Sequence, residues 1–427
     1  MTQAGTNTDS TQQGSEGVAR YDLLLRGGHV IDPKNGISKV LDVAIADGRI
    51  AAVGYAIEGT AEKIVDVSGY YVTPGLIDMH VHVDTAHYFR GSVEADGQSF
   101  SSGVTTMVDA GTAGAITFGE FKERLIDSAK TRILAYLNIV NLGMGGDFEQ
   151  DVKRMDPVAA AGVAQAYPNV IVGIKGAHYW THQPWDDEHQ PWSCVDRGLE
   201  AAALCGKPFM IDFWPRPERP YEDLILKKLR PGDIHTHVFA QQFPIILEDG
   251  RVNPALFEAQ ERGVILDVGH GAGSFWFRNA VRAIQGGFVP NSISTDLHTG
   301  NAANGLVTNI ANVMSKFLSM GLDIEKVIAL TTVAPAQEIG HPELGTLDVG
   351  TEADVAVFEL KQGQFGFIDC GRAKLVGNRR LRPVLTIRAG QVAYDPEGLT
   401  MPLWEEAPPE YWVCRQPGGA TASRKER

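Results

Sequence analysis

The 427-residue chain is poor in cysteine and has no paired cysteine motif. Its four cysteines (Cys194, Cys205, Cys370 and Cys414) lie far apart, and none belongs to a CxxC sequence. This spacing argues against a thiolate zinc site and gives no basis for a disulfide framework. A reducing compartment is then the default, and we expect the protein to be cytoplasmic.

Clusters of positive charge and long apolar runs are also missing. The chain has 38 Lys and Arg against 52 Asp and Glu, a formal net charge of −14. Such a balance argues against nucleic acid or an anionic membrane as a partner. No apolar run approaches the length needed to cross a bilayer. We therefore expect a small-molecule substrate. We also expect a homo-oligomer.

The two ends of the chain have little hydrophobic content. Residues 1–19 are rich in Gly, Ser, Thr and Gln, with neither a basic start nor an apolar segment. They do not resemble a signal peptide, so we predict a disordered tail over 1–20 and a similar one over 415–427.

Segments of strand-like texture lie inside both tails. Short apolar runs over 21–73 are separated by turn residues, of which Asp47-Gly48 is a strong hairpin signal. The same texture returns over 344–414. We expect these two segments to meet as one small composite β-sandwich domain.

The centre of the chain, 74–343, alternates between strand and helix patterns. Eight strands are predicted, at 75–83, 105–109, 133–140, 170–175, 208–213, 233–238, 264–268 and 293–296. Eight strands alternating with helices predict an α/β fold of the (β/α)8 TIM barrel type. A doubly wound open sheet is the alternative, but it should carry a glycine-rich phosphate turn after its first strand.

A histidine pair stands in that place instead. The run from Leu76 to Met79 ends in His80 and His82, directly after a Pro-Gly turn. Side chains alternate along a strand, so both imidazoles face the same side. A lone histidine is usually a core or surface residue, but two on one face can bind adjacent corners of one metal ion.

Further metal-binding side chains fall at the ends of the other predicted strands. Each has an ordinary explanation by itself, as a loop cap, a backbone partner or a solvated charge. In a barrel, however, the carboxyl ends of all strands meet at one rim. The residues concerned are Asp109, Asn138, Lys175, Asp212, His237, His270 and Asp296. Imidazoles and carboxylates gathered there favour a catalytic zinc or a similar divalent ion.

Two of these residues have a specific expected role. Lys175 ends an apolar run, and burial favours its neutral amine, which can react with carbon dioxide to form a bridging carbamate. A plain ion-paired lysine is the alternative. Asp296 is the best candidate general base, because a carboxylate beside a metal-bound water can pass its proton to a leaving group.

The chain resembles the amidohydrolase superfamily over residues 21–413, and within it the deacetylase family of D-aminoacylase-like and acetyl-mandelate-hydrolysing enzymes. The motifs that carry the likeness are 103–111, 172–175, 229–234, 267–275 and 294–298. The resemblance implies that His80 and His82 bind the more buried of two zinc ions and that carboxylated Lys175 bridges them. It further implies that His237 binds the second ion, that Asp296 is ligand and base, and that His270 and His298 contact substrate.

One position departs from the family pattern. The family has a histidine at the end of the fifth strand, where this chain has Asp212. An aspartate adds negative charge and should make bound metals weaker acids. We expect Asp212 to bind the second metal, directly or through water, with lower occupancy than usual. His235, two residues before His237, is a possible compensating ligand on the same strand face.

The loops offer weaker substrate candidates. Tyr88 and Arg90 in the first loop could anchor a carboxylate, since arginine forks onto carboxylates. The aromatic loop 178–185, with Trp192, could form a substrate wall or pack on another subunit.

The sequence thus predicts a metal-dependent hydrolase of an amide or ester, of the N-acyl amino acid or acyl hydroxy acid type. Metal-bound hydroxide would attack the carbonyl, with Asp296 as the base. A cyclic amidase of the dihydroorotase or hydantoinase kind is the rival, and a non-catalytic scaffold on the same fold is a third reading.

Overall fold

The computed structural model describes residues 19–179, 185 and 189–414. The tails expected at 1–20 and 415–427 therefore fall outside the described residues, except for Ala19 and Arg20. Among the described residues, no helix is both long and apolar enough to cross a membrane.

Both ends of the chain contribute to one mixed sheet. Eight strands take part, in the order β15-β14-β13-β5-β1-β2-β3, with β4 paired to β1. They are β1 (Arg20–Asp32), β2 (Ile37–Ala46), β3 (Arg49–Gly54), β4 (Thr60–Asp66), β5 (Tyr71–Pro74), β13 (Val355–Ile368), β14 (Lys374–Arg388) and β15 (Gln391–Tyr394). Antiparallel pairing of β13 with β5, from Val355 opposite Pro74 to Phe358 opposite Tyr71, joins the two ends. The first and last segments of the described chain thus lie in one sheet.

The turn between β2 and β3 has the residues its backbone requires. Asp47 and Gly48 both take positive φ angles, 51° and 72°. Two left-handed residues in succession suit the twist of a two-residue hairpin, and Asp-Gly accepts that conformation readily. The local sequence signal therefore sets this hairpin.

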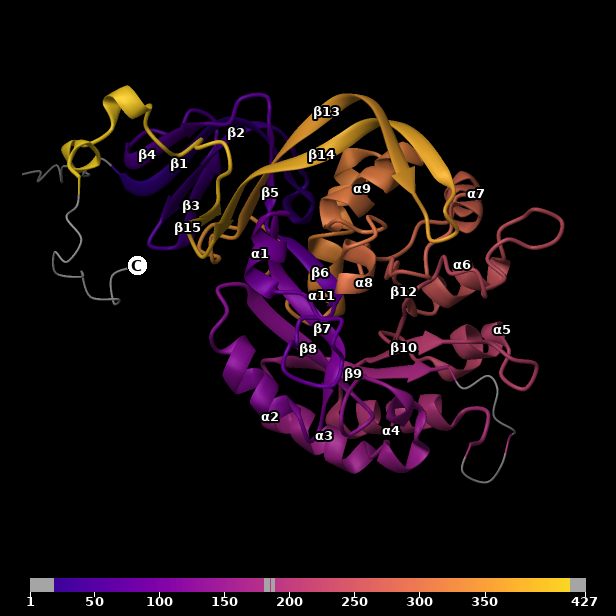
Figure 1. Cartoon of the computed structure of the whole chain (residues 1–427). Coiled ribbons are helices and arrows are strands. Elements are labelled where there is room, and N and C mark those ends of the chain that lie inside the picture. The colour runs from indigo at the N-terminus through magenta and orange to yellow at the C-terminus, as the bar shows by residue number, and fades with distance from the viewer. Residues whose placement is uncertain (1–18, 180–184, 186–188, 415–427) are drawn as a thin grey trace, which may run out of the picture.

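A second, parallel sheet follows the chain order from strand to strand. Its seven strands are β6 (Leu76–Val81), β7 (Val104–Gly114), β8 (Arg132–Asn138), β9 (Ile171–His178), β10 (Phe209–Phe213), β11 (Ile234–His235) and β12 (Ile265–Leu266). The sheet curls, as Figure 1 shows. The α/β class and the parallel sheet agree with the sequence prediction.

The predicted eighth strand is not a regular strand. Isolated parallel bridges connect Ser292 with Asp267 beside β12, and Leu297 with Val81 at the end of β6. Residues 292–297 thus contact both edges of the curled sheet without forming a ladder. Asp296 has a φ of 48°, which a regular strand cannot contain.

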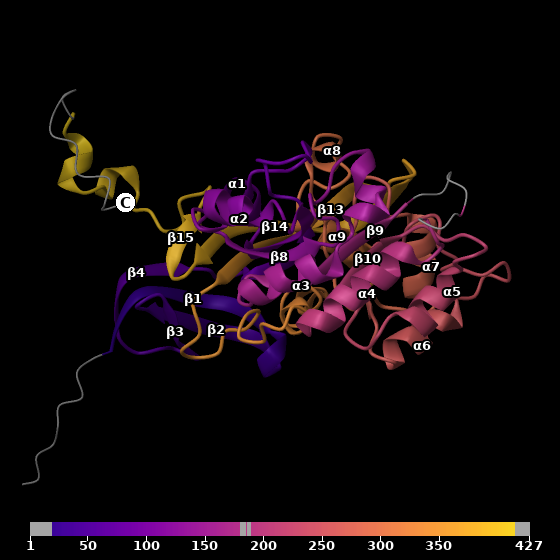
Figure 2. The same ribbon diagram turned by 90° about the horizontal axis from the view of Figure 1, so that it is seen from below.

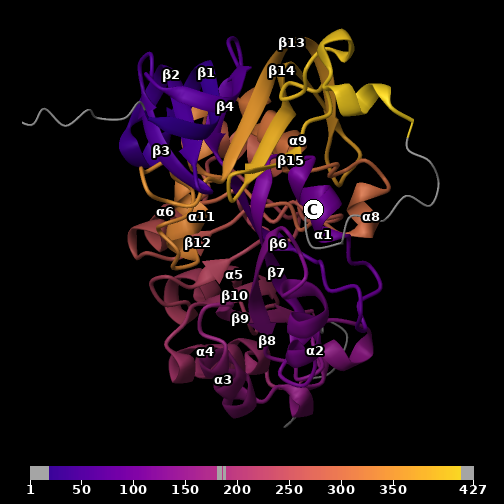
Figure 3. The same ribbon diagram turned by 90° about the vertical axis from the view of Figure 1, so that its left-hand side faces the viewer.

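Helices lie between and after the strands of the parallel sheet along the chain. They are α1 (Ala95–Phe100), α2 (Phe118–Phe121), α3 (Pro157–Ala166), α4 (Ser193–Cys205), α5 (Tyr221–Asp223), α6 (Pro254–Glu261), α7 (Phe277–Gln285), α8 (Thr299–Ala302), α9 (Ile310–Ser319), α10 (Ile324–Ala329) and α11 (Val333–Glu338). π-Helical turns, Lys122–Ile126 and Leu224–Lys228, extend α2 and α5. Viewed from below, α4, α5 and α6 lie at the side of the molecule away from β1–β4 (Figure 2). A second side view places α2, α3 and α4 farthest from the terminal sheet (Figure 3).

Two apolar clusters surround the parallel sheet. The larger one fills the space between the strands and the helices. The smaller one lies inside the curl and includes Met79, Val108, Tyr136 and, from α11, Ala336. This inner cluster supports the strand ends at which the polar side chains gather.

The long β13–β14 hairpin reaches over α9 (Figure 1). The backbone amide of Leu381 donates to Ser315 on α9 at 3.0 Å. Near the hairpin's tip, the amide of Cys370 donates to the carbonyl of Phe275 at 3.0 Å. The C-terminal hairpin thereby holds the glycine-rich loop 269–275 against the parallel sheet.

Candidate metal centre

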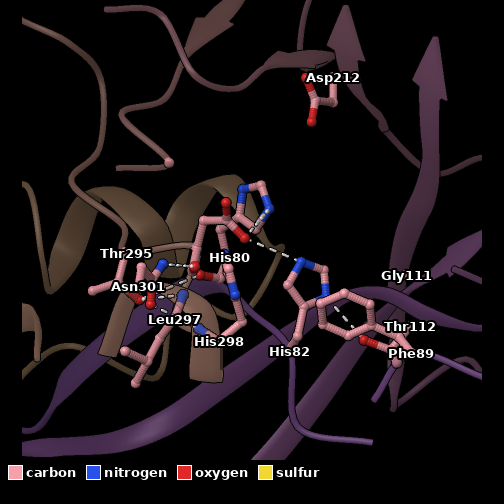
Figure 4. A network of polar contacts seen from close by, with 12 residues as sticks. His80, His82, Phe89, Gly111, Thr112, Asp212, Thr295, Leu297, His298 and Asn301 are labelled. Carbon is pink, nitrogen blue, oxygen red and sulfur yellow. Dashed lines mark hydrogen bonds and ion pairs between the residues drawn. The ribbon is translucent and has the colours of Figure 1, made fainter. Parts of the chain in front are cut away.

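His80 and His82 converge on one carboxylate at the end of β6. Both are buried. The Nε2 atoms of His80 and His82 lie 3.7 Å and 3.1 Å from Oδ1 of Asp296. One donor atom from each of the three residues lies within 4.8 Å of the others (Figure 4). Three donors of this kind at this spacing can bind one divalent ion.

The other nitrogen of each histidine is held by a threonine. Nδ1 of His80 is 2.9 Å from Thr236 Oγ1, and Nδ1 of His82 is 2.9 Å from Thr112 Oγ1. Thr236 donates its own hydroxyl hydrogen to Asp267 at 2.8 Å. It must therefore accept from Nδ1–H of His80, so Nε2 of that ring carries the lone pair that faces Asp296. Burial and then the charge of Lys175 hold the pKa of His80 well below its usual value, which keeps the ring neutral.

Asp296 takes its place through an unusual backbone conformation. Its amide donates to the carbonyl of His80 at 2.7 Å while its φ is positive. Burial alone would raise the pKa of Asp296, but the hydrogen bond and charge of His82, together with His237, outweigh it and lower the pKa. The carboxylate is therefore ionised at neutral pH.

Lys175 approaches the same group from β9. Its side chain is buried, and Nζ lies 3.4 Å from Nε2 of His80. The neighbouring position on β7 is Gly111, where an added Cβ would lie 2.7 Å from Cγ of Lys175. The lysine stem thus depends on a glycine for its space.

Asp212 and His237 pair with each other at the ends of β10 and β11. Nε2 of His237 lies 2.9 Å from Oδ2 of Asp212, while Nδ1 donates to the carbonyl of Gly269 at 2.5 Å. Burial alone would lower the pKa of His237, but the charge and hydrogen bond of Asp212 raise it to about 9. The hydroxyl of Tyr179 also contacts Asp212. Figure 4 shows Asp212 apart from His80 and His82.

A cavity of ≈250 Å³ brings these residues together. All six predicted metal ligands line it, along with His298, Phe89, Ala110, Asn138, Met144, Glu149, Ala177, Tyr179 and residues 272–274. His298 caps the N-terminus of α8 and accepts from the amide of Gly300 through Nδ1 at 3.1 Å. That contact places the proton of its neutral ring on Nε2, which can donate to a ligand.

Three predicted substrate or ligand residues lie elsewhere. Tyr88 and Arg90 are exposed and do not line the cavity, so neither anchors a group inside it. His235 was expected on the same face as His237. β11 ends at His235, however, and the φ of His237 is 64°, so the alternation of a strand does not continue. His235 packs between Tyr221 and Phe243, with ring centroids at 5.2 Å and 4.7 Å.

His270 has a structural position beneath the cavity wall. Its ring stacks on Phe275 with centroids 4.4 Å apart, and it has no exposed surface. The ammonium of Lys316 donates to Nε2 of His270 at 2.6 Å, and to the carbonyls of Leu306 and Ile368 at 2.8 Å each. His270 therefore connects the loop that lines the cavity to α9, and it is not among the residues that line the cavity.

The predicted aromatic wall is only partly described. Tyr179 lines the cavity, whereas Trp192 stacks on Phe213 with centroids 5.7 Å apart. Residues 180–184 and 186–188 of that loop lie outside the described residues. Asp109 and Asn138, which fall at the predicted rim, bond to nearby backbone groups, two of them in β7.

Sequence reasoning missed Phe89 and Glu149. The ring of Phe89 lies 5.1 Å from that of His82 and 6.1 Å from that of His298. Glu149 comes from the loop after β8, a stretch without periodicity. The glycines at 143, 145 and 146 are the one signal of close packing in that loop.

Curated relatives share most of this chain. A deacetylase from Enterococcus faecalis is 31% identical over 389 residues, covering 88% of this chain and 99% of the relative. A deacetylase from Agrobacterium fabrum is 35% identical over 331 residues, covering 74% of this chain and 77% of the relative. A search with protein-family models gave no match.

Solved structures share the fold. The crystal structure of an adenine deaminase matches with a TM-score of 0.79 at 29% identity, covering 88% of this chain and 100% of that one. A dihydroorotase structure matches with a TM-score of 0.73 at 30% identity, covering 87% and 98%. Together with the deacetylase relatives, these matches establish that the chain belongs to the amidohydrolase superfamily of hydrolytic enzymes, among its deacetylase-like members.

Proposed function

We propose that this protein is a metal-dependent hydrolase that cleaves the acyl bond of a small amide or ester, as in the deacylation of an N-acyl compound. The observation that carries the proposal is the convergence of His80 Nε2, His82 Nε2 and an ionised Asp296. The names of the two curated relatives, both deacetylases, support the same reaction.

The donor set fits divalent zinc. His80, His82 and Asp296 would hold the more buried ion, and a carboxylated Lys175 would bridge to a second ion held by His237 and Asp212. Neutral imidazoles and carboxylates are ligands that zinc prefers. When bound, such an ion polarises the substrate carbonyl and lowers the pKa of water.

The remaining chemistry belongs to the side chains of the protein. Asp296 accepts the proton of the attacking water and returns it to the leaving group. Nε2–H of His298 donates to an oxygen of the substrate. Phe89 packs against both His82 and His298 and limits the access of water to them.

Asp212 is the residue in which the second proposed metal site differs from the family pattern. Its carboxylate already contacts His237 and Tyr179. We propose that Asp212 binds the second metal, directly or through water, and that this site is incompletely occupied. Elemental analysis that gave two full equivalents of metal in both the wild type and Asp212→Ala would contradict this assignment.

A cyclic amide is the second candidate substrate. It is favoured by the dihydroorotase structure, which matches at 30% identity. Ring opening adds water and yields one product, whereas deacylation yields two. Mass spectrometry of the products separates these reactions.

We also propose that residues 292–297 complete a (β/α)8 barrel over 74–343, and that 21–73 with 344–414 form a separate β-sandwich domain. The bridges of Ser292 and Leu297 to the two sheet edges support the closure. The pairing of β13 with β5 supports a shared terminal domain. The homo-oligomeric state stays a prediction.

A screen of acyl amides and esters with zinc-loaded protein tests the function. We expect hydrolysis that a chelator abolishes and zinc restores, and that His80→Ala and His82→Ala abolish. A purified protein that binds no divalent ion and hydrolyses none of these substrates would overturn the proposal.

A further inference from the structure

One of the charged side chains that line the cavity does not belong to the proposed metal-binding set. Among the described residues, the lining carries Lys175, the carboxylates of Asp212, Asp296 and Glu149, and His237, whose pKa is raised to about 9. All of these except Glu149 belong to the proposed metal-binding set. Glu149 is therefore the charged side chain of the described lining that remains available to the rest of a substrate.

The position of Glu149 is fixed by its loop. It lies in a short 3-10 turn, Asp147–Gln150, after β8. The next residue, Gln150, donates to the carbonyl of Ala177 at 3.2 Å and accepts from the amide of Tyr179 at 2.8 Å. These two bonds tie the turn to the end of β9, close to Lys175.

The glycines before the turn are in close contact with neighbouring segments, which fixes the path of the loop. An added Cβ at Gly143 would lie 2.1 Å from the carbonyl oxygen of Thr112, and one at Gly145 would lie 2.9 Å from Cβ of Tyr88. The ring of Phe148 also packs edge-on against Tyr88, with centroids 5.3 Å apart. The carboxylate is therefore built into the wall.

A counter-charge for a substrate anion is missing from the same wall. Within the described part of the chain, Lys175 is the only lysine or arginine that lines the cavity. Arg90 is exposed. Arg219 contacts His178 and the carbonyl of Trp214. A carboxylate on the substrate would thus meet Glu149 without a cation that is free of the metal-binding set.

We propose that Glu149 is a specificity-determining residue that selects substrates bearing an ammonium group, or a comparable strong hydrogen-bond donor, and disfavours acidic substrates. This inference rests on the proposed hydrolase function and names the substrate class of that site. On this inference the substrates are acylated amines rather than N-acyl amino acids, which carry a carboxylate. Burial raises the pKa of Glu149 to about 7, although the charge of Lys175 and the backbone amide of Gly145 act in the opposite direction, and a substrate cation would further stabilise its ionised form.

Three acetylated amines of nearly equal shape test the selection with zinc-loaded enzyme. They are N-acetyl-diaminobutane, which is cationic, N-pentylacetamide, which is neutral, and N-acetyl-aminopentanoate, which is anionic. We expect kcat/KM for the cationic amide to exceed that for the neutral one by about tenfold or more, as a charged hydrogen bond provides. In Glu149→Gln the ratio should fall to about one. The control Glu123→Gln removes an exposed carboxylate that does not line the cavity, and it should leave the ratio unchanged.

A binding measurement makes the result independent of turnover. Butylammonium and butanol are titrated into zinc-loaded wild type and Glu149→Gln by calorimetry. We expect tighter binding of butylammonium in the wild type and loss of that preference in the variant. A ratio near one in the wild type, a ratio unchanged by Glu149→Gln, or a preference for the anionic amide overturns the inference. If no amide is hydrolysed but the binding preference holds, the proposed function fails while the role of Glu149 stands.

Discussion

At the scale of single residues, two threonine hydroxyls decide which nitrogen of each histidine faces the site. The chain Asp267–Thr236–His80 leaves Nε2 of His80 as the lone-pair donor. Partners of this kind orient metal-binding histidines and strengthen them as ligands.

Thr236→Val should therefore weaken zinc binding by about 10- to 100-fold while the protein stays folded. Zinc affinity is measured by competition with a chromogenic chelator. Thr331→Val is the matched control, since the buried hydroxyl of Thr331 bonds only to helix carbonyls. Equal affinity in wild type and Thr236→Val would contradict this role of the threonine.

Asp296→Asn should lower kcat by about 10²- to 10⁴-fold, because an amide cannot accept the proton of the attacking water. Circular dichroism should stay that of the wild type. A variant that retains full activity would exclude Asp296 as the base.

The Asp212–His237 pair makes the stability of metal-free protein depend on pH. The pKa of His237 is about 9 in the folded state, above its ordinary value of 6.5, owing to Asp212. The folded state thus binds the proton more tightly than the unfolded state. This stabilisation is fully present below about pH 6.5 and is lost as the pH rises through about 9.

Thermal melting of chelator-treated protein checks this expectation. Tm should fall between pH 6.5 and 9, and Asp212→Asn should flatten the change. A Tm that rises over this range in the wild type would show that the pair is not ionised.

Four of the proposed metal-binding residues, His80, His82, Lys175 and Asp212, could be placed at the cavity from the sequence because each lies at or just after the end of a buried, mostly apolar strand. Residues that reach the cavity from irregular loops could not be predicted in this way. Glu149 lies in a stretch with no repeat, and its position depends on contacts of Gly143 and Gly145 with other loops.

At the scale of elements, β7 must leave space for the lysine on β9. Gly111 has a φ of 83°, and a Cβ there would meet Lys175. Gly111→Ala should cost at least about 1 kcal/mol of stability from the left-handed backbone alone, and it should reduce the metal content by displacing Lys175.

Denaturant unfolding and elemental analysis measure both effects. Gly119→Ala in α2 is the matched control, since a Cβ there meets no other atom within 4 Å. An unchanged metal content in Gly111→Ala would contradict the coupling between Gly111 and Lys175.

Element type was predictable where strands are long and buried, as in β7 to β10. The error at His235 has a clear cause. Two residues separated by one position face the same side only within a continuous strand. β11 ends at His235, however, and the backbone turns at His237. Local sequence does not report such a break, because it depends on contacts made by Gly269 and Asp212.

At the scale of the whole molecule, metal binding should stabilise the fold, since the residues proposed to bind the metal lie on or just after β6, β9, β10 and β11 and in the segment after β12. With free zinc 100-fold above Kd, the gain is about 2.7 kcal/mol. Calorimetry with chelator and then with added zinc should show a lower and a restored Tm. An unchanged Tm would mean that no ion bridges these strands.

The joining of both chain ends in one sheet has a consequence for biosynthesis. β5 and β6 are separated by Gly75 alone, and β5 pairs with β1 on one edge. Its partner on the other edge is β13, which the ribosome makes only after the entire parallel sheet. A nascent chain therefore exposes the open edge of β5 throughout translation of the intervening residues. The edge of β5 that faces β13 can pair only after residues 355–358 have been made.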